Sequence, residues 1–319
     1  MKDLSASVGA REGRDPRLGG VVAAGLGAAL LFTASLLLRP APFGMVSPFP
    51  LLVLRLRTGA GAAWGGAVLA ASLLGAVFSP GHALAFLLLL VVPVLLIGEA
   101  MARGRGMLRG CGWAFALLVL ELGTMLFFAH ETMSALALKP IDYVGSAEFT
   151  QDWQAAGMPS DQIQAWTEWA ATFRGVMAVV YPAAYIIGGA LVVLANAALL
   201  RGYLARRDPG WLDGGEFENV RWPLGLAVLF VLSGAMVLSP PLRPAAYNLL
   251  LIEAFFFALQ GLAVVAYFAH RLAAPALLRG AVLLLVLINP WAPQILAVLG
   301  LFDLWFNFRR FADPPAEEE

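Results

Sequence analysis

The chain of 319 residues is 60% hydrophobic and only 13% charged, and its net charge at neutral pH is zero. Soluble domains carry about 25% charged residues, so this composition excludes a soluble globular protein. Continuous apolar runs approach the roughly 20 residues that cross a bilayer, and they predict an all-α, polytopic bundle of transmembrane helices in contact with lipid. We do not expect nucleic acid as a partner.

The N-terminal stretch 1–17, MKDLSASVGAREGRDPR, is polar and forms a predicted cytoplasmic tail. The apolar segment 19–38 that follows is as long as a complete span, which indicates a retained first helix and not a cleaved signal peptide. The lone Cys111 excludes a disulfide within the chain and any CxxC metal site.

One transmembrane domain is predicted over 18–310, with about 8 to 10 membrane segments judged by length and flanking breakers. The segments are 19–38, 46–56, 59–78, 83–100, 111–129, 175–200, 222–239, 245–269, 276–289 and 292–308. The segment 46–56 is short and is either a span or a re-entrant piece. Pro290 and Pro293 interrupt 276–308, so this region is either a helical hairpin or one kinked span.

The arginines predict the orientation, because cytoplasmic loops carry an excess of Lys and Arg. If every segment crosses and the N-terminus is cytoplasmic, all but four of the 21 Lys and Arg fall in inside loops. The exceptions are Arg39, Lys139, Arg174 and Arg243. We therefore predict an N-in and C-in, multi-pass protein of the bacterial inner membrane.

Three polar regions lie outside the predicted spans. The largest, 130–174, is extracytoplasmic, and its helix beginning near Ser160 carries tryptophans typical of the membrane interface. This region is either a lid over an outward-facing cavity or a simple anchor before the next span. The cytoplasmic loop 201–221 is too short for a catalytic domain, and the acidic tail 311–319 is predicted to be disordered.

Motifs of soluble enzymes are absent from the sequence: there is no GxxxxGK[ST], GxGxxG, HExxH or GxSxG. The three histidines lie at predicted segment ends, and His130 beside Glu131 does not make a set of metal ligands. We therefore expect no enzymatic activity, no cofactor and no metal site.

Polar groups inside spans are the best candidates for function, because a charge in hydrocarbon costs at least about 2.5 kcal/mol. Glu121 lies near the middle of its span, while Glu253, Gln260 and Asn248 share another span. These four residues are candidates for a polar substrate-binding pocket or a proton-linked site. The alternative is that they are neutral or paired and only hold helices together.

Two further features concern packing. Gly20, Ala24 and Ala28 form a small-xxx-small stripe on the first span, which serves either packing within the bundle or docking of a partner subunit. Asp303 lies close to the predicted inner surface and is a candidate structural clamp. We expect it to bond a helix end or an arginine from a cytoplasmic loop, such as Arg221 or Arg55.

Nearly the whole chain resembles the YybS-like family of predicted bacterial membrane proteins, a domain of unknown function. The matching features are Arg221-Trp222-Pro223 opening a span, Gln260-Gly261 within one, and the closing Gly300-Leu301-Phe302-Asp303. The family's layout is similar to the substrate-binding subunits of energy-coupling-factor importers. That resemblance implies docking at Ala24 and Ala28 and a pocket at Glu121, Glu253 and Gln260.

The leading hypothesis is therefore a substrate-binding or transport-related membrane subunit. Since the sequence has no ATP-binding motif, energy would come from a partner or an ion gradient. The alternative is a non-transporting membrane scaffold or assembly factor for envelope or division machinery.

Overall fold

The computed structural model describes residues 18–38, 41–212, 217–272, 275, 286, 289 and 291–311. Every regular element in these residues is a helix, which confirms the predicted all-α fold class. Among the described residues, six helices are long and apolar enough to cross a membrane, and two shorter apolar helices accompany them. The chain is therefore a polytopic helical membrane protein. Its N-in and C-in orientation stays a prediction.

Three predictions fall wholly or largely outside the described residues. They concern the polar tail 1–17, nearly all of the segment 276–289 and the acidic tail after Phe311. The described part of 276–308 consists mainly of α15 (Ala292–Phe306), whose 15 residues reach about 22 Å along the helix axis.

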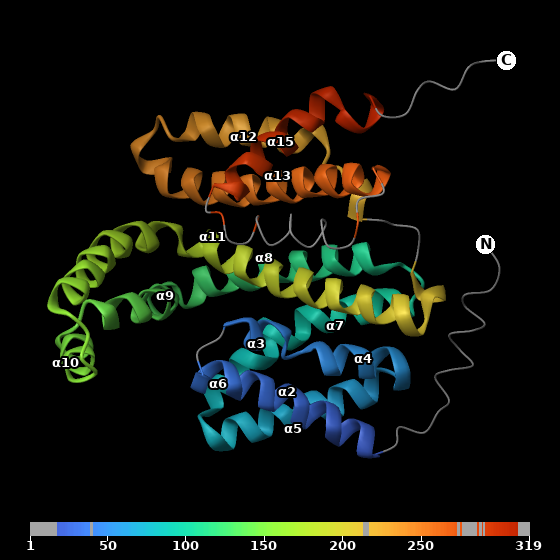
Figure 1. Cartoon of the computed structure of the whole chain (residues 1–319), viewed down its shortest axis with the longest axis horizontal. Coiled ribbons are helices and arrows are strands. Elements are labelled where there is room, and N and C mark those ends of the chain that lie inside the picture. The colour runs from blue at the N-terminus through green and yellow to red at the C-terminus, as the bar shows by residue number, and fades with distance from the viewer. Residues whose placement is uncertain are drawn as a thin grey trace. The chain divides into compact units, whose positions relative to one another are not determined.

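The chain divides into two compact units, and two of the boundaries between them fall within α8 (Met107–Phe128) and α11 (Ser160–Arg207) (Figure 1). Unit 1 comprises Met1–Thr124 with Ile186–Gly215, and unit 2 comprises Met125–Tyr185 with Glu216–Glu319. The helices before α15 are α2 (Leu18–Leu38), α3 (Ala41–Val46), α4 (Phe49–Thr58), α5 (Ala60–Val77), α6 (Pro80–Ala85), α7 (Val92–Ala102), α8 (Met107–Phe128), α9 (His130–Val144), α10 (Ala147–Ala155), α11 (Ser160–Arg207), α12 (Leu224–Met236) and α13 (Arg243–Arg271). Shorter helical turns include η3 (Phe217–Asn219) and η5 (Phe308–Phe311).

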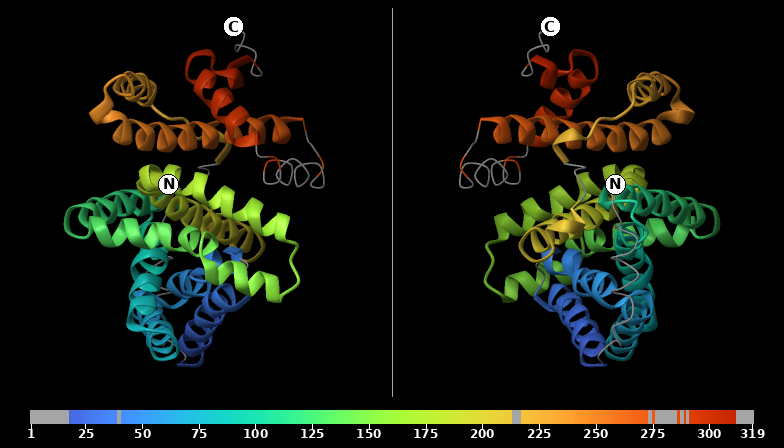
Figure 2. Two further views of the ribbon diagram at one scale, coloured as in Figure 1. Left: turned by 90° about the vertical axis from the view of Figure 1, so that its left-hand side faces the viewer. Right: turned by 90° about the vertical axis from the view of Figure 1, so that its right-hand side faces the viewer.

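Unit 1 is built on the close packing of α2 against α5, with α4 beside both (Figure 2). A Cβ added at Gly25 would lie 2.7 Å from the carbonyl oxygen of Gly66, so the two backbones meet where both residues lack a side chain. Ala28 and Ala67 are buried beside this crossing. Small residues allow such close approach in lipid, where apolar burial alone gives little drive for helices to associate.

The segment 46–56 overlaps the short helix α4, whose ten residues reach about 15 Å. That is half of the roughly 30 Å hydrocarbon core, so α4 alone does not span a bilayer. Arg55 near its end is buried and pairs with Glu99 at 2.8 Å. Glu99 also pairs at 2.7 Å with Arg103, which lies four residues further along the chain and directly follows α7.

The region 130–174 of unit 2 is a small group of helices formed by α9, α10 and the beginning of α11. Leu138 and Ile141 of α9 pack against Ala170 of α11. Asp142 and Arg174 join the same two helices through an ion pair of 2.6 Å. The loop predicted between two spans is therefore folded.

The long helix α11 joins two predicted pieces. It begins at Ser160, as expected for the helix before the span, and continues through the apolar segment 175–200 to Arg207. Its 48 residues reach about 72 Å if straight, so its N-terminal part extends well beyond a bilayer core of roughly 30 Å. The only proline within it is Pro182, inside the apolar part, where a missing N–H interrupts the helix ladder.

Within unit 2, α15 packs closely against α13, and α12 lies along α13 (Figure 1). A Cβ added at Gly261 would collide with the backbone of Leu296, and one added at Gly300 would collide with the backbone of Phe257. Two glycines thus permit backbone contact between α13 and α15. This crossing decides which polar side chains of the two helices can meet.

Candidate functional site

The α13–α15 crossing brings Gln260 beside Asp303. Gln260 immediately precedes Gly261, and its Nε2 donates to the Asp303 carboxylate at 2.9 Å. Its Oε1 accepts the backbone N–H of Trp222 at 3.0 Å, just before α12 begins. Both ends of the Gln260 amide are therefore used in holding three parts of unit 2 together.

Asp303 binds the end of its own helix as well as Gln260. Asn307 has a left-handed backbone with φ 46°, which ends α15 and turns the chain back. The turn lets Asp303 Oδ1 accept the Phe308 N–H at 3.0 Å, while Oδ2 lies 3.3 Å from Arg309 Nη2. Each carboxylate oxygen is thus occupied, which suits an acid buried to 3% exposure.

Arg309 is buried and fastens η5 to η3. It donates to the carbonyl oxygens of Glu218 at 2.6 Å and Val220 at 2.9 Å. The pKa of the Arg309 guanidinium is lowered, mainly because burial disfavours its charged form. Asp303 opposes this shift, and the nearby charge of Arg221 adds to it. We call Gln260, Asp303 and Arg309, with the backbone groups that they bind, the terminal clamp.

Asp303 contacts a helix end and an arginine, but the arginine is neither of the two named as examples. The carboxylate pairs with Arg309 and not with Arg221 or Arg55. Arg309 lies only six residues after Asp303, and the left-handed turn at Asn307 folds it back over the carboxylate. The sequence placed Arg309 in the cytoplasmic surface region, whereas its side chain is buried within unit 2.

Glu253 and Ser233 form a second buried polar contact, between α13 and α12. Ser233 Oγ donates to Glu253 Oε1 at 2.9 Å, and the two residues are 0% and 2% exposed. The other oxygen, Oε2, has no hydrogen-bond partner among the described residues. Glu253 therefore keeps hydrogen-bonding capacity that Gln260 has used.

Asn248 is bound at the proline of α11. Its side chain accepts the N–H of Ala183 at 2.8 Å and donates to the carbonyl of Val179 at 2.8 Å. In an uninterrupted helix these two backbone groups would bond to each other. Because Pro182 lies between them, Asn248 stabilises a weakened turn and joins α11 to α13.

The remaining predicted site residues have different surroundings. Glu121 lies on α8 in unit 1, where it is partly exposed. Ala28 is completely buried against α5 and Ala24 is partly buried, so their small side chains serve packing inside unit 1. Gly20 is exposed.

Within unit 2, Asn248, Glu253 and Gln260 bind three different sets of partners, and these contacts do not join them in a common pocket.

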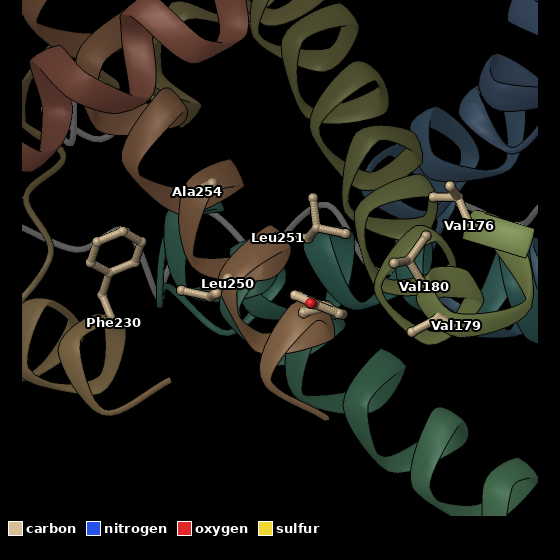
Figure 3. Close-up of a pocket in the computed structure, with 8 residues that line it drawn as sticks. Val176, Val179, Val180, Phe230, Leu250, Leu251 and Ala254 are labelled. Carbon is tan, nitrogen blue, oxygen red and sulfur yellow. The ribbon is translucent and has the colours of Figure 1, made fainter. Parts of the chain in front are cut away.

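Unit 2 also contains an apolar groove that no sequence motif indicated. Its volume is about 550 Å³, and Figure 3 shows side chains of α13 between Phe230 of α12 and valines of α11. The lining residues are Val176, Val179, Val180, Phe230, Tyr247, Leu250, Leu251 and Ala254. Such residues occur throughout transmembrane helices, so the sequence carried no signal that distinguished them.

The residues that carry the family resemblance meet in the terminal clamp and at its helix crossing: Trp222 binds Gln260, and Gly261 faces α15 near Gly300. A family model for predicted membrane proteins, DUF2232, matches residues 28–304. The chain belongs to the DUF2232 family. This match confirms the resemblance to a family of predicted membrane proteins of unknown function. No curated protein and no solved structure matches the chain.

Proposed function

We propose that this DUF2232 protein is a ligand-binding subunit of a membrane transport system, and that its ligand carries a hydrocarbon chain. The apolar groove of unit 2 carries the proposal. Its volume of about 550 Å³ lies within the roughly 300–1,000 Å³ of typical ligand sites. The proposal assigns binding and no reaction to this chain.

The surroundings of the groove favour a hydrocarbon occupant. Two of its walls come from α11 and α13, which are long and apolar enough to span a membrane. Tyr247 supplies the one side-chain hydroxyl among the eight lining residues. Water in such a groove would lack the two to four polar partners that hold buried water. An acyl or isoprenoid chain needs no polar partner there.

The polar candidates agree with a ligand that is mainly apolar. Asn248 and Gln260 are engaged with backbone and side-chain groups, so they offer little to a polar metabolite. Glu253 retains one free oxygen within a helical turn of Leu250 and Ala254, which line the groove. A polar end of the ligand would therefore have few groups to contact in unit 2.

Energy for transport would come from elsewhere. The sequence contains no nucleotide-binding motif, so movement of the ligand requires a partner subunit or an ion gradient. Asn248 fixes α11 to α13 at Val179, which is itself a groove residue. Any motion that opens the groove must therefore either break this contact or move α11 and α13 together.

A photoreactive fatty acid, such as a diazirine-bearing palmitate, tests the groove directly. In membranes that contain the full chain, we expect crosslinks on peptides that include Val180 and Leu251. Ala254→Phe fills the groove and should lower this labelling at least about ten-fold, equivalent to 1.4 kcal/mol. Ala235→Phe adds the same bulk at an exposed position of α12 and should leave labelling unchanged.

Two outcomes would reject the groove as a binding site. One is equal labelling in the wild type and Ala254→Phe, with the variant still folded by thermal denaturation. The other is equal loss in Ala254→Phe and Ala235→Phe. If crosslinking in native membranes then recovered envelope or division proteins and no transport component, the scaffold would replace the transport subunit.

A further inference from the structure

Three helix ends of unit 2 meet on the side that the arginine bias predicts to be cytoplasmic. The Trp222 N–H, just before α12, binds Gln260 of α13. Glu218 of η3 contacts His270 at the end of α13 at 3.1 Å. Arg309, just after α15, binds the Glu218 carbonyl. These contacts place the start of α12 beside the ends of α13 and α15.

Four arginines lie in the three segments that meet here. Between Phe217 and Arg221, at His270 and Arg271, and between Asp303 and Phe311, the chain carries Arg221, Arg271, Arg309 and Arg310, with the carboxylates Glu218 and Asp303. Both carboxylates are already engaged, Glu218 by His270 and Asp303 by Gln260 and Arg309. Arg221 and Arg310 form no ion pair within the residues that the structure describes, so an incoming anion would meet their positive charges there.

Arg221 and Arg309 show where such an anion would be stabilised. Arg221 is exposed and forms no ion pair within the part of the chain that the structure describes. Its positive charge is close enough to disfavour the charged form of Arg309. Arg309 is held rigidly, and its buried Nε has no partner among the described residues. An anion near both guanidinium groups would relieve their mutual repulsion.

We propose that this basic cluster, Arg221, Arg271, Arg309 and Arg310, binds the phosphate of an anionic membrane lipid. The cluster lies at the ends of apolar helices, and the exposed Trp305 is of the kind found at headgroup depth. Arginine suits phosphate because its guanidinium presents paired donors to paired oxygens. Basic pockets between transmembrane helices on the cytoplasmic side bind lipid headgroups in this way. This site is independent of the apolar groove.

Native mass spectrometry of the full chain in a neutral detergent, titrated with phosphatidylglycerol, tests the proposal. We expect one saturable lipid per chain, with binding that weakens as salt is raised. Arg221→Gln and Arg310→Gln should each weaken it about five-fold, the effect of one basic residue at an anionic membrane surface. Arg243→Gln, which removes an exposed arginine at the opposite end of α13, should leave it unchanged.

The controls separate a site from general attraction and a lipid from free phosphate. Wild-type affinity in Arg221→Gln and Arg310→Gln would overturn the proposal, as would an equal loss in Arg243→Gln. Inorganic phosphate that displaced phosphatidylglycerol at equal concentration would identify a soluble phosphate site instead. Thermal denaturation checks that every variant is folded, and both test positions are exposed, outside the buried contacts of the terminal clamp.

Discussion

Asp303 takes its role from the contacts that surround one carboxylate. It accepts from a glutamine, from the backbone at its own helix end and from a buried arginine. Removing the carboxylate would leave Arg309 as a buried charge without an ion-pair partner among the described residues. The same substitution at the exposed ion pair of Asp142 with Arg174 leaves the remaining guanidinium in contact with solvent.

We predict that Asp303→Ala destabilises unit 2 by about 3–5 kcal/mol, because breaking a buried pair leaves an uncompensated charge. Asp142→Ala is the matched control and should cost at most about 1 kcal/mol, as is usual for exposed ion pairs. Thermal denaturation in detergent measures both. Similar losses in the two variants would show that the terminal clamp adds little to stability.

The role of Asp303 could be predicted from the sequence in part, whereas its partner could not. A carboxylate near a predicted membrane surface, close to aromatic and basic residues, was recognisable as a structural element. Its partner was not, because Arg309 reaches it only through the left-handed turn at Asn307. Asn248 was recognised as a polar residue in a span, but its bonds to the backbone around Pro182 depend on a second helix.

Glycines decide how closely whole helices can approach. At Gly261 and Gly300 the backbones of α13 and α15 are in contact, and the polar pair Gln260–Asp303 forms beside them. The glycine pair Gly25–Gly66 has the same function in unit 1. By contrast, a Cβ added at Gly188 of α11 would meet nothing within 4 Å.

We predict that Gly300→Ala destabilises the protein by about 1–3 kcal/mol, the usual cost of an overpacked contact. The added methyl group must push α15 away from Phe257, which lengthens the Gln260–Asp303 hydrogen bond. Gly188→Ala should be neutral or stabilising by up to about 1 kcal/mol, because alanine favours the helix more than glycine does. Urea or thermal unfolding in detergent compares them, and equal stability of the two variants would refute close packing at Gly300.

The whole molecule is a polytopic membrane protein, and the distribution of charge alone predicts its orientation. The arginine bias predicts that the 201–207 end of α11 faces the cytoplasm, while the α10–α11 turn faces outward. Both regions are described and have exposed side chains suited to labelling.

We predict that, in a Cys111→Ser background, Ala156→Cys reacts with a membrane-impermeant maleimide in spheroplasts that retain an intact inner membrane. Arg206→Cys should react only after that membrane is permeabilised, because the positive-inside rule places it in the cytoplasm. Labelling yield by mass spectrometry checks both positions. The reversed pattern would invert the topology, and it would also move the basic cluster of unit 2 away from the cytoplasmic leaflet.

The sequence by itself determined that this is an all-α membrane protein, where most of its helices lie and that it belongs to a family of predicted membrane proteins. Those properties are local, because hydropathy and helix length accumulate along the chain. Only the tertiary structure decided that Gln260 meets Asp303 across 43 residues, that Arg309 is buried and that an apolar groove lies beside Asn248. Such features depend on which two segments pack together. Glycine contacts and hydrogen bonds between segments decide which segments pack together, and the hydropathy of a single segment does not indicate them.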